Sequence, residues 1–581
     1  MSTMSTTGVD RLLELLRNHG CDVIFGVPGD TNVAFYGGFT RNEDAPTHVM
    51  ARDERSAGFM AEAYARVSGK PGLVEVPSGA GPIYALPAVA EAERSSVPLI
   101  MLTFETALKA ERRGLISEID CAAVVRPVAK DSWQLKSPNL LGDAIRRAFR
   151  LAQGPRPGAT HLAIPEDLLH ADTGNDTHAD PAPASPCGPS AEAISALVGL
   201  LKQARKPMLL AGAGVNRAKA QQALHRCAEA WSLPVVSSLT GQGALDDSHD
   251  LNFGVVGDNG YHPHAIEAVN ESDLLICLAT ALGSTLTMGG RFPEPRKDRK
   301  LIHVDIDNLI LGQTYPPTLA IAADAGAFLD ALAREATAPL FMEWSDTIAV
   351  KRRETRAADT SVLESEETPL WPERVMHALQ PYVTGRTNLV LDPGTPTPYA
   401  ARYLRLGDGS NYVIPRGFGG LGYAIPGVVG AWMADPDATL VGMFGDGSMG
   451  MSSGELETLA RLNVPAKLLH FSNGTFGLIK SIQRQTAGNA VASVDFTQLD
   501  AAAIAKSYGI PSWHVETGPD LDAALSKAFL TDGPAFVDIV VEDISQILAP
   551  MFNLTRRTGA NPLTRDRTIR RPVRPPNGLP T

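Results

Sequence analysis

The chain has 581 residues, 44% of them hydrophobic and 20% charged, which is the composition of an ordinary globular protein. At roughly 150 residues per domain, this length predicts about three domains. The net charge of −12 argues against a dedicated nucleic-acid-binding protein. The five cysteines are scattered without a CxxC pair, so neither a disulfide framework nor a structural zinc site is expected. We see no secretory signal and no apolar run near the ~20 residues that span a bilayer, so the expected location is the cytoplasm.

The first predicted domain covers residues 1–175. A helical pattern over 9–16 opens it, and helices such as 56–67 then alternate with apolar strands such as 98–103. This alternation is typical of a parallel sheet with helical crossovers. Residues 172–191 are rich in Pro, Ser, Asp and Ala and are interpreted as a linker.

Two further blocks repeat the alternation, a central domain over 192–335 and a third domain over 369–545. Residues 336–368 are charged and irregular, and we expect them to connect these two domains. At the start of the third domain, Thr368 is predicted to cap a helix whose first residue is Pro369. Residues 546–581 are interpreted as a basic C-terminal tail. The strands predicted in the two domains are 207–211, 234–237, 274–279 and 301–304, then 388–391, 439–444, 467–471 and 535–540.

The strongest chemical signal is the sequence Gly445-Asp446-Gly447-Ser448, which directly follows the strand at 439–444. After a helix, the strand at 467–471 ends in Ser472-Asn473-Gly474-Thr475. Because neighbouring parallel strands end at the same edge of a sheet, this crossover is expected to bring Asp446 and Asn473 together. Their oxygens are ligands that Mg²⁺ prefers, with phosphate oxygens completing the octahedron. Gly445 and Gly447 would let a phosphate approach the backbone closely. The alternative is an ordinary glycine-rich turn.

With these residues the chain resembles the thiamine diphosphate enzyme superfamily, and within it the acetolactate synthase-like branch. The family motif is GDG followed by an asparagine a little under 30 residues later, and here Asn473 lies 27 positions after Asp446. The resemblance covers roughly residues 8–545 and implies three α/β domains, each a mostly parallel sheet flanked by helices: pyrimidine-binding, central and diphosphate-binding. It further implies that Asp446, Asn473 and the main-chain oxygen of Thr475 ligate the metal, with Ser448 in the cofactor site.

The resemblance assigns the catalytic role to Glu54, in the sequence Arg52-Asp53-Glu54-Arg55 before a helix. In the family, a glutamate here hydrogen-bonds the pyrimidine ring and helps the cofactor lose its thiazolium proton. The structural alternative is an acid placed favourably at a helix N-terminus. Asp53 stands where many relatives have histidine.

Three other segments match cofactor-contacting loops of the family. In the glycine-rich loop 416–426, Leu421 matches the apolar residue that bends the cofactor, and the carbonyl of Gly419 matches the partner of its amino group. Thr395 and Thr397 fall where relatives contact the diphosphate, with turn capping as the alternative role. Near the amino terminus, Pro28 matches a cofactor contact, while substrate contacts are assigned to Asp30, Ser78 and Gly79.

The resemblance implies an enzyme that decarboxylates a 2-oxo acid and joins the carbanion to a second carbonyl compound. The His-His pair of many simple decarboxylases is absent from 104–109, and Ser117 occupies a position where acetolactate synthases commonly have glutamine. A 2-oxo acid decarboxylase or an acyl-CoA lyase or decarboxylase is therefore the alternative within the family. A non-catalytic regulatory relative is the alternative outside it, although such a protein would be expected to lose Glu54 or a metal ligand.

The remaining expectations concern the central domain and assembly. Leu210-Ala211-Gly212-Ala213-Gly214 matches a segment with which relatives bind FAD, but a lone GxG is weak evidence, so FAD is not the favoured prediction. His262 and His264 are interpreted as solvated loop residues. In the family, two chains grip one cofactor, so a homodimer or homotetramer with shared active sites is expected, without nucleic-acid or membrane partners.

Overall fold

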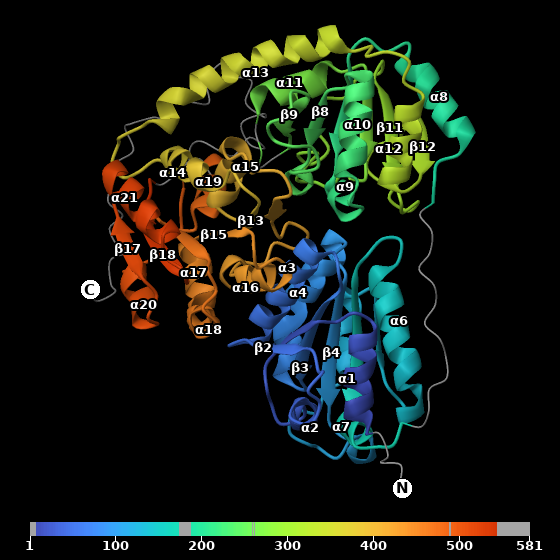
Figure 1. The fold of residues 1–581 in the computed structure, drawn as a ribbon, viewed down its shortest axis with the longest axis vertical. Coiled ribbons are helices and arrows are strands. Elements are labelled where there is room, and N and C mark those ends of the chain that lie inside the picture. The colour runs from blue at the N-terminus through green and yellow to red at the C-terminus, as the bar shows by residue number, and fades with distance from the viewer. Residues whose placement is uncertain (1–6, 174–186, 258–259, 261, 487–489, 543–581) are drawn as a thin grey trace.

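A computed structural model describes residues 7–173, 187–257, 260, 262–486 and 490–542. Within them the chain forms three six-stranded parallel sheets, each flanked by helices (Figure 1). This confirms the predicted fold class. The linker prediction falls largely on 174–186, outside the described residues, and the predicted tail lies entirely within 543–581, which is also outside them.

The first sheet has the strand order β2-β1-β3-β4-β6-β5. Its strands are β1 (Val23–Gly26), β2 (Thr47–Met50), β3 (Gly72–Pro77), β4 (Leu99–Glu105), β5 (Asp131–Gln134) and β6 (Ala159–Pro165), and its helices are α1 (Gly8–Asn18), α2 (Val33–Phe39), α3 (Glu54–Ser68), α4 (Ala80–Ser95), α5 (Cys121–Val125), α6 (Leu141–Gln153) and α7 (Glu166–Leu169).

The third sheet, β14-β13-β15-β16-β18-β17, repeats the order of the first. Its strands are β13 (Thr387–Leu391), β14 (Asn411–Val413), β15 (Thr439–Gly445), β16 (Lys467–Ser472), β17 (Ser512–Val515) and β18 (Ala535–Val540). Its helices are α14 (Pro372–Leu379), α15 (Pro396–Tyr403), α16 (Ala424–Ala434), α17 (Asp446–Ser452), α18 (Leu456–Leu462), α19 (Gly477–Thr486), α20 (Ala501–Ser507) and α21 (Gly518–Phe529).

The central sheet is wound differently, in the order β12-β11-β10-β7-β8-β9. Its strand order reverses between β7 and β10, the place where doubly wound sheets bind ligands. Its elements are α8 (Ala191–Leu201), β7 (Pro207–Ala211), α9 (Ala213–Arg217), α10 (Gln221–Trp231), β8 (Val235–Ser237), β9 (Asn252–Val255), α11 (Pro263–Glu271), β10 (Leu274–Leu278), β11 (Lys300–Asp305), β12 (Leu319–Ala322) and α12 (Ala325–Arg334).

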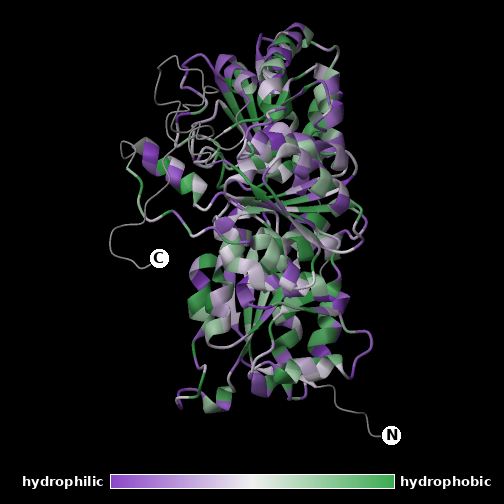
Figure 2. Ribbon diagram, turned by 90° about the vertical axis from the view of Figure 1, so that its left-hand side faces the viewer, coloured by the Kyte–Doolittle hydropathy of each residue, from purple (hydrophilic) through white to green (hydrophobic). Residues whose placement is uncertain are grey.

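Apolar residues are concentrated in the strands and on the inner faces of the helices (Figure 2). Continuous apolar strands such as β4 are buried along their full length, as expected for parallel sheets covered on both faces. The first and third domains share one core, because α3 packs directly on α16. A Cβ at Gly430 would lie 1.9 Å from the main-chain oxygen of Met60, so only glycine permits this close crossing.

Two predictions at the start of the third domain were wrong. Residues 342–363 are not irregular but form α13 (Met342–Leu363), the long helix that runs from the central domain to the third domain along the top of Figure 1. Few of its residues are buried, so its sequence lacks the apolar periodicity by which helices are recognised. The next helix, α14, begins at Pro372 with Trp371 as its cap, three residues after the predicted start.

Candidate cofactor site

Asp446 lies where the sequence predicts it, at the carboxyl end of β15 and beside the end of β16. Its Oδ2 accepts hydrogen bonds from the main-chain nitrogens of Asn473 and Gly474, at 2.9 and 3.1 Å. The strand–helix–strand crossover therefore brings the two predicted metal ligands into contact.

The side chain of Asn473 completes a cluster of polar atoms. One terminal atom of its amide lies 3.2 Å from Oδ2 of Asp446 and 3.1 Å from the main-chain oxygen of Thr475. The two ends of an amide are assigned from their surroundings. With nitrogen in this place, the amide donates to both neighbours. With oxygen in this place, three oxygens converge without a hydrogen between them, an arrangement that a hard cation such as Mg²⁺ satisfies.

Gly445 and Gly447 of the Gly-Asp-Gly sequence lie in different surroundings. A Cβ at Gly447 would lie 2.3 Å from the ring of Phe476, so packing within the chain excludes a side chain there. A Cβ at Gly445 would meet nothing nearer than 3.7 Å, the main-chain oxygen of Phe471. Gly445 therefore leaves open space beside the ligand cluster, which is the room that a bound group needs.

A histidine that sequence reasoning missed lies behind this cluster. His470, buried in β16, has its Nδ1 2.8 Å from Asp538 Oδ1 and its Nε2 3.7 Å from Asp446 Oδ1. Asp538 contacts His514 Nδ1 through its other oxygen, at 2.8 Å. His470 can therefore orient Asp446 from inside the domain. The signal in the sequence is one ionisable residue in the interior of each apolar strand, His470 in β16 and Asp538 in β18.

Asp392 is a second residue that the sequence did not single out. It is buried at the end of β13 and accepts hydrogen bonds from the main-chain nitrogens of Gly422, Tyr423 and Ala424, at 2.9, 3.0 and 2.7 Å. Burial raises the pKa of this carboxyl, while the three donors oppose the shift. Asp392 thus anchors the end of the glycine-rich loop to the strand that precedes Thr395.

The start of the same loop is anchored by Glu91, from α4 of the first domain. Its carboxylate accepts hydrogen bonds from the main-chain nitrogens of Gly417, Phe418 and Gly419, at 2.9, 2.6 and 3.1 Å. Arg66 pairs with Glu91 at 3.0 Å and lowers the pKa of that carboxyl against the opposing effect of burial. The loop that carries Leu421 is therefore held at both ends by buried carboxylates.

The predicted cofactor contacts in these loops are placed as follows. Gly419 is exposed and has a φ of 79°, a backbone conformation that favours glycine, and Leu421 beside it is half-buried. Thr395 precedes the first residue of α15. Thr397 is fully buried, and its hydroxyl donates to the main-chain oxygen of Asp392 at 2.6 Å, so that hydroxyl proton is not offered to a phosphate. Ser448 contacts this region through its hydroxyl, 3.4 Å from the main-chain nitrogen of Gly422.

Glu54 is the first residue of α3, and Asp53 is the cap of that helix. Asp53 accepts from the main-chain nitrogen of Ser56 at 2.9 Å, which is the local reason for an acid at this position. Glu54 is half-buried, and burial raises its pKa, with the negative charges of Asp53 and Glu75 acting in the same direction. A carboxyl in such surroundings binds a proton more readily than one in water, which suits proton exchange with a ligand.

The amino-terminal loops meet at the carboxyl edge of the first sheet. The main-chain nitrogen of Ser78 donates to the hydroxyl of Thr31, at 2.9 Å, and its own hydroxyl donates to the main-chain oxygen of Ser117, at 2.7 Å. Gly79 has a φ of 83° and lies against Ser117. Pro28 and Asp30 are exposed. These positions form one rim, to which the unusual Ser117 also belongs.

Within one chain, this rim and Glu54 are not joined to the metal-ligand cluster. Among the described residues, no hydrogen bond or ion pair links Glu54 to Asp446 or Asn473. The segment before α3 instead contacts the short turn of helix 453–455 that follows α17, where Arg52 donates its main-chain N–H to Glu455 at 2.8 Å. The predicted site residues thus belong to two domains, and no polar contact joins Glu54 to Asp446 or Asn473 in the described part of the chain.

Comparison with known families matches all three domains. The N-terminal TPP-binding domain of thiamine pyrophosphate enzymes matches residues 6–124, the central domain matches 194–332, and the C-terminal TPP-binding domain matches 392–539. The chain belongs to the thiamine diphosphate-dependent enzymes. Glu54 lies in the first matched segment, and the metal-ligand cluster lies in the third.

Individual relatives indicate the branch of this family. The chain is 26% identical over 564 residues to a probable acetolactate synthase large subunit of Methanococcus aeolicus, with 93% of each chain covered. It is 27% identical to a probable acetolactate synthase large subunit of Methanocaldococcus jannaschii, with 92% of each covered. It is also 27% identical to acetolactate synthase isozyme 1 large subunit of Escherichia coli, with 94% of this chain and 95% of that one covered. The protein is thus a thiamine diphosphate-dependent carboligase or decarboxylase of the acetolactate synthase-like branch.

A cavity of about 320 Å³ lies at the point where the strand order of the central domain reverses, and residues of the other two domains also line it. Arg94, Arg156 and Arg217 line it, with Asp305 at the end of β11. The glycine of the GxG segment at position 212 is required by packing, since its Cβ would lie 2.2 Å from the main-chain oxygen of Ala279. The GxG segment is therefore explained without a ligand.

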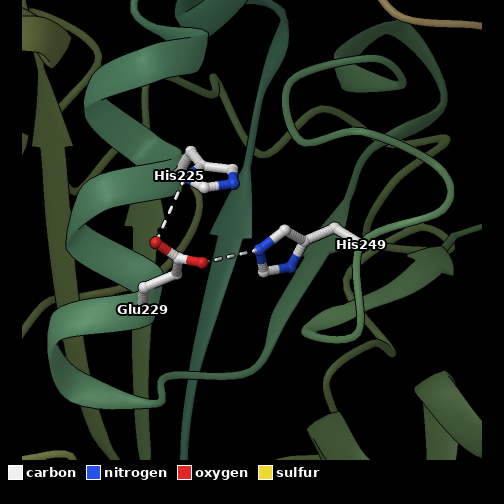
Figure 3. A group of neighbouring side chains, drawn as sticks. All are labelled: His225, Glu229 and His249. Atoms are coloured by element: carbon white, nitrogen blue, oxygen red, sulfur yellow. Dashed lines mark ion pairs between the residues drawn. The ribbon is translucent and has the colours of Figure 1, made fainter.

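A cluster of His225, Glu229 and His249 lies on the outside of the central domain (Figure 3). His225 Nδ1 and His249 Nε2 are 3.4 and 3.7 Å from the oxygens of Glu229. His249 Nδ1 accepts the main-chain N–H of Leu251 at 3.1 Å, so the proton of its ring is on Nε2, facing Glu229. A metal-bound histidine donates its other N–H instead. The cluster is therefore a pair of histidine rings that face one carboxylate, separate from the site.

Two expectations about the rest of the chain can be compared with the structure. His262 and His264 are not solvated, since they lie at the start of α11 and make hydrogen bonds to main-chain oxygens of Arg402 and Phe253. That prediction was wrong, because the sequence did not show that the third domain covers them. In the described part of the chain, no helix is both long and apolar enough to cross a membrane.

Proposed function

We propose that this enzyme decarboxylates a 2-oxo acid and transfers the resulting acyl carbanion equivalent to a second carbonyl compound, using thiamine diphosphate and Mg²⁺. Bound thiamine diphosphate supplies an electron sink for the carbon that loses CO₂. The protein supplies position, exclusion of water and the metal site.

The observation that carries this proposal is the convergence of Asp446, Asn473 and the main-chain oxygen of Thr475. These are one anionic and two neutral hard oxygen donors, too few to fill an octahedron. Mg²⁺ held in this way keeps positions for diphosphate oxygens. Ser448 and Gly445, which adjoin the cluster, would border that diphosphate.

The proposed role of Glu54 is to hold a proton opposite the pyrimidine ring. The raised pKa of its carboxyl supports this role. A carboxyl that holds a proton more tightly can share that proton more evenly with the pyrimidine ring. Leu421 and the carbonyl of Gly419, held by the anchored loop, are proposed to bend the cofactor and to accept a hydrogen bond from its amino group.

We further propose that the complete site forms between two chains, with Glu54 from one and Asp446 from the other. The segments that carry the proposed site residues also expose large apolar side chains, which is uncommon on a monomeric surface. These side chains are Val33, Ile83, Tyr84, Phe418, Met451 and Ile479, with 45–65% of their surface exposed. A second copy of the chain would cover them.

The test is an assay of the purified enzyme with thiamine diphosphate, Mg²⁺ and a panel of 2-oxo acids. CO₂ release should depend on both cofactors, and mass spectrometry of the products should show a new carbon–carbon bond. Release of the protonated aldehyde alone would instead identify a decarboxylase. CO₂ release or cleavage only from acyl-CoA substrates would support the lyase alternative, and no turnover despite cofactor binding would support a non-catalytic relative.

FAD in the central domain stays a less favoured prediction. The cavity of about 320 Å³ is at the small end of small-molecule sites. The visible absorption spectrum of the purified protein, before any cofactor is added, tests this directly.

A further inference from the structure

A second cavity, of about 220 Å³, lies where the central domain meets α13 and α15. Its walls come from residues 252–255 at β9, from the start of α11, from α13, and from residues 401–405 at the end of α15. None of the residues assigned above to the metal, the cofactor or the substrate lines it. Its chemistry is therefore not explained by the proposed reaction.

The charges around this cavity are unbalanced. Its acidic lining residues already have partners: Asp359 pairs with Arg402 at 2.7 Å, and Asp247 accepts the hydroxyl proton of Tyr412 at 2.8 Å. Four arginines line the same cavity, at positions 352, 356, 402 and 405.

Two of these arginines are buried with unused donors. The side chains of Arg352 and Arg402 are 11% and 4% exposed. The Nε atom of each is buried and has no hydrogen-bond partner within the protein. Burying a guanidinium N–H without a hydrogen-bond acceptor costs free energy. Two arginines with such groups line one cavity, which points to a ligand that supplies acceptors there.

The other two arginines lie at the surface of the cavity. Arg356 and Arg405 are exposed, and in the described part of the chain neither guanidinium has a hydrogen-bond or ion-pair partner. Partial burial of its guanidinium, together with the positive charges of Arg405 and Arg352, lowers the pKa of Arg356 to about 10. An anion between these groups would relieve the repulsion and make bidentate hydrogen bonds with them.

The cavity also offers acceptors. Gln242 and His264 are among its lining residues, and Gln242 Oε1 and His264 Nδ1 are buried and have no hydrogen-bond partner within the protein. His264 Nε2 lies 3.0 Å from the main-chain oxygen of Phe253, so its proton is on that side and Nδ1 is an acceptor. These two atoms favour a ligand that carries a hydroxyl proton as well as negative charge.

We propose that this cavity binds inorganic phosphate or a small hydroxylated phosphate ester. The four arginines would bind the charged oxygens, and Gln242 and His264 would accept the hydroxyl proton. At neutral pH sulfate has a similar size and charge but no such proton, so the site should bind it more weakly.

The test is isothermal titration calorimetry of the enzyme saturated with thiamine diphosphate and Mg²⁺, which keeps phosphate out of the cofactor site. Inorganic phosphate, glycerol phosphate and sulfate are the probes, at constant ionic strength. The double variant R356Q/R405Q should bind the phosphate probes at least tenfold more weakly. R353Q is the matched control, because Arg353 is also exposed on α13 but does not line the cavity.

The expected result is saturable binding of a phosphate probe to the wild type and to R353Q, weakened in the double variant, with sulfate bound less tightly. Whichever of the two phosphate probes binds more tightly identifies the source of the phosphate group. Thermal unfolding without added anions should show the double variant at least as stable as the wild type, since it removes like-charge repulsion. Absence of saturable phosphate binding, unchanged binding by the double variant, an equal loss in R353Q, or sulfate binding as tight as phosphate would overturn the proposal.

Discussion

At the scale of single residues, Asp446 supports two interactions with the same oxygen. Its Oδ2 accepts two main-chain hydrogen bonds from the turn at Asn473, and it adjoins the other oxygen donors of the cluster. Asp446→Ala should therefore abolish Mg²⁺-dependent binding of thiamine diphosphate, because the one anionic ligand is removed from a site with few protein donors. Calorimetry measures this, with Asp437→Ala, an exposed aspartate before the same strand, as the control. Unchanged cofactor affinity in Asp446→Ala would contradict the metal assignment.

Glu54 is expected to affect chemistry more than binding. Glu54→Gln keeps the shape of the side chain but removes the group that shares a proton. Folding and cofactor binding should largely survive, while turnover falls by at least ~10²-fold, the low end for acid–base groups. Exchange of the thiazolium C2 proton, followed by NMR in the wild type and the variant, separates this role from a structural one. An exchange rate near that of the wild type would rule it out.

At the scale of elements, Glu91 connects α4 of the first domain to the glycine-rich loop of the third. In Glu91→Gln an amide group would face main-chain N–H groups that now donate to a carboxylate, and hydrogen bonds to charged groups contribute about 1.5–3 kcal/mol each. We expect the affinity for thiamine diphosphate to fall by at least ~10-fold, which corresponds to about 1.4 kcal/mol.

The matched control is Glu93→Gln. Glu93 lies on the same helix and also accepts a main-chain N–H, from Ala159 at 3.0 Å, but does not contact the loop. If the affinity for thiamine diphosphate falls equally in both variants, the cause is a change in the stability of α4 and not the lost contact with the loop. Limited proteolysis of the loop in the two variants gives a second readout.

A buried histidine makes the first sheet sensitive to acid. His161 on β6 is 2.8 Å from the hydroxyl oxygen of Ser132 on β5 and 2.9 Å from that of Thr103 on β4. Burial lowers its pKa to about 3, so it stays neutral in the folded chain while the unfolded chain takes up a proton near pH 6.5. Stability contributed in this way is present above pH 6.5 and is lost as the pH falls toward 3.

We therefore expect the free energy of unfolding to fall by about 1.4 kcal/mol per pH unit for this histidine between pH 6 and 4. His161→Gln should show a shallower dependence in urea unfolding across that range, although it is less stable at pH 7. His170→Gln, at an exposed position, is the control. An unchanged pH dependence in His161→Gln would show that the folded chain already binds this proton.

In the whole molecule, the proposed site residues belong to two domains, and among the described residues no hydrogen bond or ion pair joins Glu54 to Asp446 or Asn473. An interface that joins them between two chains should be obligate and largely apolar, above ~2,000 Å² in total. Mixing inactive Glu54→Gln with inactive Asp446→Ala, under conditions that let subunits exchange, should restore activity. A mixed dimer has one site with both defects and one with neither, so it should approach half the activity per dimer.

The control for this experiment is each variant exchanged with itself, which should stay inactive. Mass spectrometry should confirm that mixed dimers have formed. Failure to recover activity in proven mixed dimers, or an active monomer in light scattering, would defeat the shared-site proposal.

The three parallel-sheet domains and the pairing of Asp446 with Asn473 could be predicted from the sequence, because both depend on local periodicity and on a single crossover between neighbouring strands. The tertiary structure alone decided which side chains hold those elements in place. Glu91 reaches the loop at Gly417 across 326 positions of the chain, and Asp538 contacts His470 because β16 and β18, which are far apart in the sequence, are neighbours in the sheet. Such contacts follow from how domains pack, and no local pattern encodes them. The arginine-lined cavity arises for the same reason, since its walls come from α13, from the central domain and from the third domain.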